Sequence, residues 1–469
     1  MIVRDRLLAL GLAALLPGSA IQAQPVSTVT PEASRTAAAY GDDLMPLDTK
    51  SRADLLRATA FDATIYGMSA YLQYEQLYRQ VFDARASNHT GYNRFYHERD
   101  LAGPDYETFK VPNTDTLYST AWIDLSRGPV EIAIPATSLK YYTLNIFDIF
   151  GNPSNLSSRT VGFGGGRFLV VPPGWTGTVP QGLTLFRATS VQLWILMRSF
   201  AQSRSDVAKA RTFQNGVTIT PTAATTGASA STPAPPAPAP HAVGFLRALD
   251  TILRRNGHLP GEEALVSRFR PLGVGGAKAF DPAMFDPAAQ TAIEAGYKDA
   301  VALLNTSKAQ LGMPTGSGWM KVNKGEYGFN YVRRSVTNTA GLGANVREEN
   351  ASYTAFTDGS GKILNGATSR YTLHLTTPPP VDAFWSVTLY DAETFALYPN
   401  PLKRYLISDR TPGLKVAADG SIVIHLQHAM TKENWLPAPS NPFFVVMRAY
   451  SPEAAMLNGQ WLPPAIVAN

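Results

Sequence analysis

The sequence predicts a mainly β protein with α segments, in which a helical insert separates two β-sandwich regions. Three observations predict this class. Apolar residues alternate with polar ones from Thr120 to Arg198 and again from Arg370 onward. They recur at helical spacing from Ser51 to about Phe82 and within residues 243–317. Glycine and proline interrupt the alternating runs about every ten residues, as they do in antiparallel sandwiches.

The N-terminus has the layout of a secretory signal peptide. Two arginines within residues 1–6 precede the apolar run Leu7–Leu16, and a small residue, Ala23, follows. That run is shorter than the roughly 20 residues that a membrane-spanning helix needs. We therefore expect residues 1–23 to be a signal peptide cleaved near Ala23. The expected protein is periplasmic or secreted, with no transmembrane segment in the mature chain.

Composition excludes several classes of function. The chain has no cysteine, which removes disulfides, thiolate nucleophiles and zinc–sulfur sites. The net charge is +5, but only 16% of the residues are charged and no window clusters five lysines or arginines. We therefore expect no nucleic-acid partner. The G-x-S-x-G, H-E-x-x-H and Walker motifs are absent as well. The prediction is no metal and no cofactor.

Residues 45–219 are predicted to form the first domain, a long helix followed by a β-sandwich. Ser51 and Asp54 are interpreted as the capping pair at the start of the helix. Alternation within Val130–Ile134 and Tyr142–Phe147 indicates the strands that follow.

The remaining boundaries follow from changes in composition. Residues 220–242 are rich in alanine, proline and threonine without an apolar period, which is typical of a linker. Residues 243–317 are predicted to be helical, and Asp286 caps a helix whose first residue is Pro287. Residues 318–469 are predicted to form a jelly-roll-like sandwich, because at least four alternating strands follow one another in about ninety residues.

The richest side-chain chemistry lies in one turn and strand near position 115. Asn113 and Asp115 follow a proline, so one interpretation is an Asx turn that caps the strand. Tyr118 and Trp122 favour the other interpretation, because aromatic faces beside polar groups are typical of clefts for sugars and small ligands. In an apolar cleft the pKa of Asp115 would rise, and its carboxyl could serve as a general acid.

Other candidates lie elsewhere in the chain. His97, two residues before Arg99, is the first candidate for an acid–base group, with a structural hydrogen-bonding role as the alternative. Asp124 and Asp148 are the candidate partner carboxylates for Asp115. Arg448 alternates with apolar residues and shares a face with Tyr450, either in a groove or in solvent. A second polar–aromatic cluster, which either contacts ligand or locks a loop, consists of Arg404, Tyr405, Asn434 and Trp435.

Two runs of the sequence resemble known families. Val111–Asp124, with Tyr141-Tyr142, Asp148 and Arg159-Thr160, resembles the domain-of-unknown-function family numbered 1254. Asp382–Asp391, with the run Asn434–Pro439, resembles the family numbered 1214. The resemblance implies an immunoglobulin-like β domain, a helical insert and a jelly-roll C-terminal domain, and it implies no established reaction. Arg159 is a further ligand-binding candidate within the first run.

Together these patterns predict an exported cell-envelope protein that binds a small polar or carbohydrate-like ligand in a polar–aromatic cleft. Whether it also hydrolyses that ligand stays open. One alternative is a non-catalytic envelope structural or assembly protein, whose motif residues hold loops together. A more distant alternative is a metal-dependent enzyme. His425 and His428 would be its natural ligands, but on a strand their spacing directs them to opposite faces.

Overall fold

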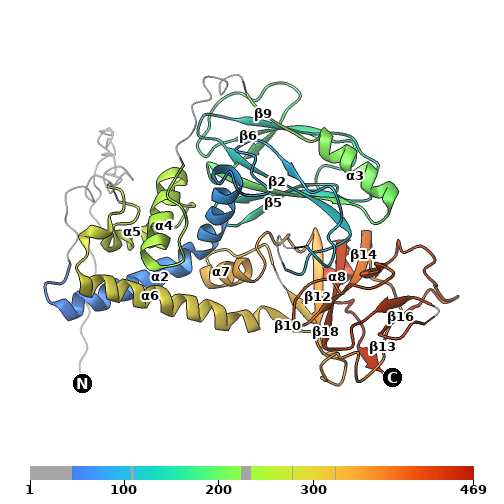
Figure 1. The fold of residues 1–469 in the computed structure, drawn as a ribbon. Coiled ribbons are helices and arrows are strands. Elements are labelled where there is room, and N and C mark those ends of the chain that lie inside the picture. The colour runs from blue at the N-terminus through green and yellow to red at the C-terminus, as the bar shows by residue number, and fades with distance from the viewer. Residues whose placement is uncertain (1–44, 107–109, 223–233, 277, 323, 432) are drawn as a thin grey trace, which may run out of the picture. The chain divides into compact units, whose positions relative to one another are not determined.

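The computed structural model describes residues 45–106, 110–222, 234–276, 278–322, 324–431 and 433–469. Figure 1 shows these residues as a group of helices and two groups of strands. The expected signal peptide, residues 1–23, and positions 223–233 of the expected linker lie outside the described residues. Within the described ranges, no helix is both long and apolar enough to cross a membrane.

The first described helix, α2, spans Thr49–Leu77 and continues into a π-helical turn, Tyr78–Phe82, which confirms the long helix predicted from the apolar spacing. Its start differs from the prediction. The carboxylate of Asp48 is the N-cap and accepts a hydrogen bond from the backbone N–H of Ser51 at 2.8 Å. Asp54 instead accepts from Lys50 Nζ one turn away, so Ser51 and Asp54 do not form a capping pair.

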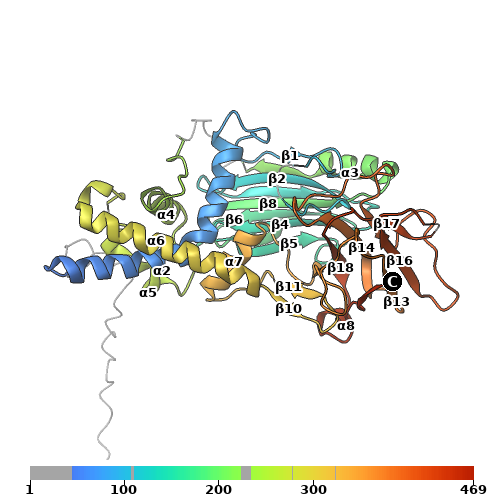
Figure 2. The ribbon, with the colours of Figure 1, turned by 60° about the horizontal axis from the view of Figure 1, so that its bottom comes forward.

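The other helices of this group contribute to one core with α2. They are α4 (Ala242–Asn256), α5 (Glu263–Ser267), α6 (Pro287–Ser307) and α7 (Tyr331–Ala340), with 3₁₀ turns at Arg270–Leu272, Pro282–Met284 and Lys308–Gln310. Asp286 caps α6 by accepting from Ala289 N–H, as predicted. Helices α2 and α6 run side by side in Figures 1 and 2. Helix α7 lies among residues that the sequence assigned to the C-terminal β domain, yet Ser335 Oγ on α7 donates to Ile65 O of α2 at 2.7 Å.

The predicted N-terminal sandwich consists of two sheets. The five-stranded sheet is antiparallel, in the order β1 (Tyr96–His97), β2 (Thr116–Asp124), β8 (Gln192–Phe200), β4 (Tyr142–Asp148) and β5 (Pro153–Ser157). The four-stranded sheet has the order β7 (Thr184–Arg187), β6 (Gly166–Val171), β3 (Val130–Ile134) and β9 (Thr218–Pro221), in which β6 and β7 are parallel. Helix α3 (Arg204–Gly216) follows β8.

The five-stranded sheet is buried on both faces. Leu117, Ala121 and Ile123 of β2 pack into the core between the two sheets. Trp122 points the other way, into the core shared with the helices, and stacks on Trp194 of β8 at 6.3 Å between ring centroids. Because neither face meets solvent there, β4 is buried along its whole length, and its polar residues Thr143 and Asn145 are as fully buried as its apolar ones.

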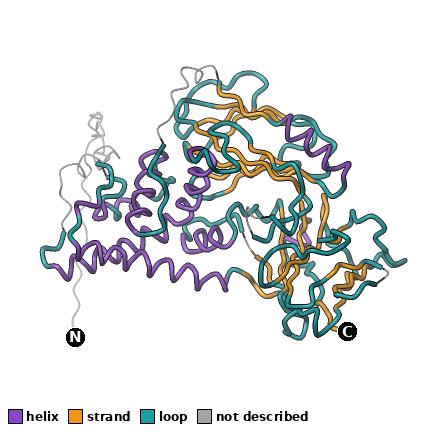
Figure 3. The backbone as a smooth tube through the Cα atoms, in the orientation of Figure 1, coloured by secondary structure: helices purple, strands orange, loops and turns teal. Residues whose placement is uncertain are grey.

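The C-terminal β region also consists of two sheets over one core, as predicted. The six-stranded sheet has the order β10 (Gly312–Pro314), β11 (Met320–Val322), β12 (Asn350–Ala355), β18 (Phe443–Pro452), β14 (Val381–Asp391) and β15 (Leu406–Ser408). The four-stranded sheet has the order β17 (Trp435–Pro437), β16 (Ile422–Gln427), β13 (Tyr371–Leu375) and β19 (Ile466–Ala468). Helix α8 (Ala454–Leu457) follows β18. Figure 3 shows the strands in two groups beside the helices.

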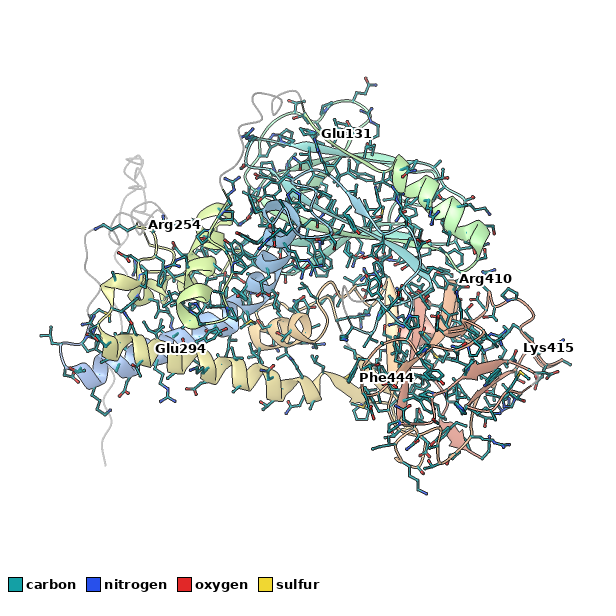
Figure 4. All side chains as sticks on the ribbon, viewed as in Figure 1. Glu131, Arg254, Glu294, Arg410, Lys415 and Phe444 are labelled. Carbon is teal, nitrogen blue, oxygen red and sulfur yellow. The ribbon has the colours of Figure 1, made fainter. Side chains whose placement is uncertain are left out.

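The period of two in β14 and β18 divides their side chains between two environments. Odd-numbered residues such as Val387 and Met447 enter the core of the C-terminal sandwich. Even-numbered residues form the outer face of the six-stranded sheet, where Phe444, labelled in Figure 4, stacks on Tyr390 at 5.1 Å between ring centroids. On the same face Tyr450 contacts Tyr141, which comes from the N-terminal region, at 5.2 Å. This outer face is therefore buried against the N-terminal sandwich.

The close packing of α2 against α6 depends on Gly296. A Cβ atom at this position would overlap the backbone carbonyl of Arg57, which cannot rotate away. We predict that Gly296→Ala lowers the free energy of unfolding by about 1–2 kcal/mol, because overpacking outweighs the gain in helix propensity. Chemical denaturation measures the change. Gly164→Ala is the control, since no described atom lies within 4 Å of its added Cβ. Equal stability of the two variants would contradict the account.

Candidate functional site

A buried carboxylate connects the two β regions. Asp115 precedes β2 and is fully buried. Its Oδ2 accepts a hydrogen bond from Ser386 Oγ at 2.6 Å, and its Oδ1 accepts one from the Tyr450 hydroxyl at 2.7 Å. Ser386 belongs to β14 and Tyr450 to β18. The start of the N-terminal sheet is thus bonded to the outer face of the C-terminal sheet.

Asn113 extends this network along the same turn. Its Nδ2 donates to the Tyr450 hydroxyl at 3.0 Å, and its Oδ1 accepts from Thr116 Oγ1 at 2.9 Å. The first of these bonds crosses to the C-terminal sheet, and the second stays within the turn. An Asx turn needs a backbone N–H as donor, so the bond from the Thr116 hydroxyl to Asn113 is not the predicted Asx turn.

Arg448 lies next to this network. In the register of the sheet it is the direct partner of Ser386, so both side chains occupy the outer face. Its Nη1 donates to the Tyr390 hydroxyl at 2.9 Å, and its Nη2 donates to Val111 O at 3.1 Å. Arg448 is 9% exposed, which places the guanidinium between the sheets rather than in solvent.

Burial controls the protonation of Asp115. Removal from water raises the pKa of its carboxyl above the ordinary 3.8, although Arg448 and the hydroxyl groups of Ser386 and Tyr450 act in the opposite direction. A raised pKa is what the sequence predicts for Asp115 in an apolar setting. Both carboxylate oxygens already accept hydrogen bonds from the protein.

A cavity of about 540 Å³ lies beside this network. Its walls come from three parts of the described chain. The N-terminal region supplies Lys110, Val111, Asn113, Tyr118 and Arg198. Helix α7 and the loop after it supply Thr337, Ala340, Gly341, Leu342, Gly343, Ala344 and Asn345. The C-terminal region and the segment before it supply Lys324, Asn350, Ser352, Thr354, Val446, Arg448 and Tyr450.

A smaller cavity of about 110 Å³ shares Tyr118, Arg198 and Leu342 with the larger one. Arg198 stands over the Tyr118 ring at 5.5 Å, and its Nη2 donates to Gly343 O at 2.9 Å. Glu98 lines the smaller cavity, and burial raises the pKa of its carboxyl. The shared residues form a polar and aromatic wall between the two spaces.

Lys324 is the most strongly perturbed base in the larger cavity. Its Nζ donates to Asn350 Oδ1 at 3.0 Å and to Ser352 Oγ at 3.1 Å. Burial, followed by the positive charges of Arg198 and Arg448, lowers the pKa of the Lys324 ammonium to about 7. All three cations line the same space.

Comparisons with known proteins support this division of the chain. Residues 92–221 match the family model described as a protein of unknown function, DUF1254, and residues 349–454 match that described as a protein of unknown function, DUF1214. The chain carries a DUF1254 region followed by a DUF1214 region. This confirms the resemblance inferred from the motifs. Asn113, Asp115 and Tyr118 lie in the DUF1254 region, while Ser386, Arg448 and Tyr450 lie in the DUF1214 region.

Two solved structures are similar to this chain. The crystal structure of the VPA0106 protein from Vibrio parahaemolyticus has a TM-score of 0.69 at 22% identity and covers 88% of this chain and 100% of its own. An uncharacterized protein from Burkholderia cenocepacia has a TM-score of 0.45 at 14% identity, covering 93% of this chain and 94% of its own. The first likeness supports the fold alone. Comparison with curated proteins gives no match.

His97 lies in the DUF1254 region outside the linings of the two cavities. Its Nδ1 is 2.8 Å from Ser119 Oγ, and its ring stacks on Phe95. Gln214 Nε2 donates to the same Ser119 oxygen, which leaves the serine hydroxyl free to donate to His97. Burial, assisted by Arg99, lowers the pKa of the imidazole to about 4. At neutral pH His97 is therefore an uncharged hydrogen-bonding residue.

Asp148 and Arg159 lie apart from Asp115 and make other bonds. Asp148 accepts from the backbone N–H groups of Phe150 and Asn152, both at 2.9 Å, and so organises the turn after β4. Arg159 Nε donates to Glu349 Oε1 at 2.8 Å, which forms a second polar link between the DUF1254 and DUF1214 regions. Neither residue lines the two cavities.

The second sequence cluster joins loops of the DUF1214 region. Asn434 Nδ2 donates to the backbone carbonyl of Lys415 at 2.8 Å (Figure 4) and to that of Val423 at 2.9 Å. Arg404 Nη1 donates to Trp435 O at 3.1 Å, and Trp435 Nε1 donates to a backbone carbonyl of β16 at 2.8 Å. Tyr405, the last member of the cluster, packs with the aromatic group around Phe444 on the outer face.

The structure thus brings Asn113, Asp115 and Tyr118 together with Arg448, but it does not bring them together with the second cluster or with Trp122. Sequence reasoning did not find Arg198 or Lys324. Arg198 had a signal, because it is the only charged residue in the apolar strand β8. Lys324 had none, since it lies outside any periodic segment. Among the described residues, no group of three His, Cys, Asp or Glu side chains could hold a metal ion.

The pH dependence of stability tests the burial of Asp115. Because its pKa is raised, the folded protein holds this proton more tightly than the unfolded chain does. Ionisation of Asp115 therefore costs stability as pH rises from about 4 through the folded pKa, by at most about 1.4 kcal/mol per pH unit. We predict that the unfolding free energy of the wild type minus that of Asp115→Asn falls with rising pH in this window.

Asp419→Asn is the matched control. The backbone N–H of Ser421 lowers the pKa of this exposed carboxyl, so its contribution to stability is present above the unfolded pKa and is lost as pH falls. The corresponding difference curve should slope in the opposite direction. A wild-type minus Asp115→Asn difference that rises with pH would show that the Asp115 carboxylate is stabilised by folding.

Proposed function

We propose that the protein binds a small polar organic molecule in the 540 Å³ cavity between the DUF1254 and DUF1214 regions. The observation that carries this proposal is the convergence of polar side chains from both regions on one space: Asn113 and Tyr118 from one side, Arg448 and Tyr450 from the other. Ligand pockets typically have volumes of about 300–1,000 Å³ and combine apolar walls with a few placed polar groups. The volume and lining of this cavity agree with both features.

Binding is a better account of this cavity than hydrolysis. Glycoside hydrolysis uses two carboxyl groups that flank the scissile bond. None of the described residues that line the larger cavity is an aspartate or glutamate. Asp115 lies beside the cavity, with both oxygens accepting hydrogen bonds from Ser386 and Tyr450. Because its oxygens bond to the protein, this carboxyl is better suited to holding the residues that line a binding site in position.

The aromatic part of the site is smaller than the sequence suggested. Tyr118 contributes to the walls of both cavities, whereas Trp122 is stacked on Trp194 within the core. The ligand therefore meets one aromatic ring from β2 rather than two. The signal-peptide layout of residues 1–23 supports the cell envelope as the location of this binding.

The alternative of a structural protein has its own supporting observation. The cluster of Arg404, Asn434 and Trp435 holds loops together through side-chain to backbone hydrogen bonds. A structural role fits this cluster, which lies outside both cavities. It does not explain why polar side chains from both regions line the larger cavity. The two clusters therefore support different roles for different parts of the chain.

A thermal-shift screen with neutral sugars, organic acids and amides tests the proposal. A ligand at about 100 times its dissociation constant adds about 2.7 kcal/mol to the stability of the folded state. We predict at least one specific ligand, and we predict that Tyr118→Phe weakens its effect because the tyrosine lines both cavities.

Trp435→Phe is the matched control, since Trp435 bonds a backbone carbonyl outside the cavities. It should lower the melting temperature of the free protein without changing the increment that the ligand adds. A ligand whose increment depends on Trp435 and is unchanged by Tyr118→Phe would contradict the assignment of the site.

A further inference from the structure

We propose that the molecule bound in the larger cavity is an anion, whose carboxylate or phosphate group lies among Arg198, Lys324 and Arg448. This inference rests on the proposed function and names its ligand class. Arg198, Lys324 and Arg448 come from different segments and line one space, whose lining also includes the exposed Lys110. Among the described residues, none of those that line this space is acidic.

Within the part of the chain that the structure describes, no ion pair neutralises the positive charge of the cavity. Among the described residues, the acceptors of Lys324 Nζ are the neutral oxygens of Asn350 and Ser352. Arg198 donates to the carbonyl of Gly343, and its Nη1 is buried with no hydrogen-bond partner among the described residues. A buried guanidinium nitrogen without an acceptor is costly, and an anionic oxygen is the acceptor that suits it best.

Glu98 lines the smaller cavity together with Arg198, and Asp115 lies in the network beside Arg448. The charge of Asp115 acts on Arg448, whose own hydrogen bonds go to Tyr390 and Val111. Neither carboxylate lines the larger cavity, whose lining has four cationic side chains. Even with Asp115 ionised, the cavity retains excess positive charge, which an anionic ligand would neutralise.

The register of the sheet explains why these charges lie together. Ser352 of β12 is the partner of Arg448 of β18, and Asn350 is the partner of Tyr450. Lys324 Nζ bonds to the side chains of both Asn350 and Ser352, so its ammonium lies over β12, the strand next to that of Arg448. This proximity agrees with the effect of Arg448 on the pKa of Lys324, which is lowered to about 7.

The remaining walls describe the rest of the ligand. Apolar side chains complete the cavity: Leu311, Val322, Leu342, Phe395 and Val446. The cavity has a cationic part and an apolar part. An anion with a compact apolar or aromatic body matches these two parts better than a sugar with hydroxyl groups on every side. Arginine forms paired hydrogen bonds to carboxylate and phosphate alike, so both head groups fit the polar end.

Benzoate and phenyl phosphate, compared with neutral benzamide, test the inference. At constant ionic strength, we expect one or both anions to raise the melting temperature and benzamide to leave it unchanged. The anion with the larger shift identifies the preferred head group. Lys324→Met should weaken anion binding at least tenfold, as measured by calorimetric titration. Lys324→Gln is a second variant in case the first fails to fold.

Lys321→Met is the matched control, since it removes an equal charge three residues away, outside the cavity lining. Lys321 Nζ donates to backbone carbonyls near α8, and anion affinity should be unchanged in this variant. Equal weakening by Lys321→Met and Lys324→Met would reduce the effect to general charge attraction and overturn the inference.

The pH dependence of binding gives a second readout. The free Lys324 ammonium loses its proton near pH 7, and a bound anion raises that pKa. Benzoate keeps a constant charge near neutral pH, so its affinity should fall as pH rises above about 7, and the fall should be absent in Lys324→Met. Arg198 and Arg448, whose charges act on Lys324, are both kept in this variant.

The outcomes separate the two proposals. Benzamide binding as well as benzoate, or a neutral sugar binding where neither anion does, would overturn the anionic ligand and leave the binding function standing. If none of the anions, sugars or amides binds, both proposals fail.

Discussion

The buried carboxylate of Asp115 is the interaction on which the junction of the two β regions depends. A carboxylate removed from water is stable only when hydrogen-bond donors and positive charge replace its hydration. Here the donors are Ser386 and Tyr450, which lie 271 and 335 positions away in the sequence, and Arg448 supplies the charge. The site therefore exists only when the DUF1254 and DUF1214 regions are both folded and in contact.

This constraint also shapes the cavity. The outer face of the six-stranded sheet packs through Phe384 and Tyr450 against Tyr141 and Phe200 of the N-terminal region. Beside this aromatic contact, the same face presents Ser352 and other polar side chains, which cannot pack against apolar ones without leaving groups unbonded. The loop after α7 closes the space that is left. A binding site between two rigid sheets holds its polar groups in fixed positions, which favours recognition of a defined head group.

Local sequence patterns predicted the elements but not their contacts. The period of two identified both sandwiches, and Asp286 before Pro287 located the start of α6. The same patterns did not show that the five-stranded sheet is covered by helices on its second face, which is why Trp122 looked available for a ligand and is instead part of a core. Strand alternation indicates which residues share a face, but it does not indicate what that face meets.

The site itself shows the same limit. The side-chain chemistry near Asp115 was visible as a local cluster, and Arg448 and Tyr450 were recognised as neighbours on one face. Their combination into one network depends on contacts between distant segments. Arg198 lowers the pKa of Lys324 through its charge. The two residues are far apart in the sequence, so no local sequence pattern shows that they lie together. The cluster at Asn434 and Trp435 has a composition similar to that of the segment around Asp115. Its polar and aromatic side chains instead bond to the backbone and hold loops together.

The most direct test of this account is a double-mutant cycle between Asp115→Asn and Tyr450→Phe, measured by equilibrium denaturation. If the carboxylate and the hydroxyl form one bond across the junction, the loss in the double variant should be smaller than the sum of the single losses, by about 1 kcal/mol or more. Effects that add within about 0.3–0.5 kcal/mol would contradict a direct bond between the two regions at this position.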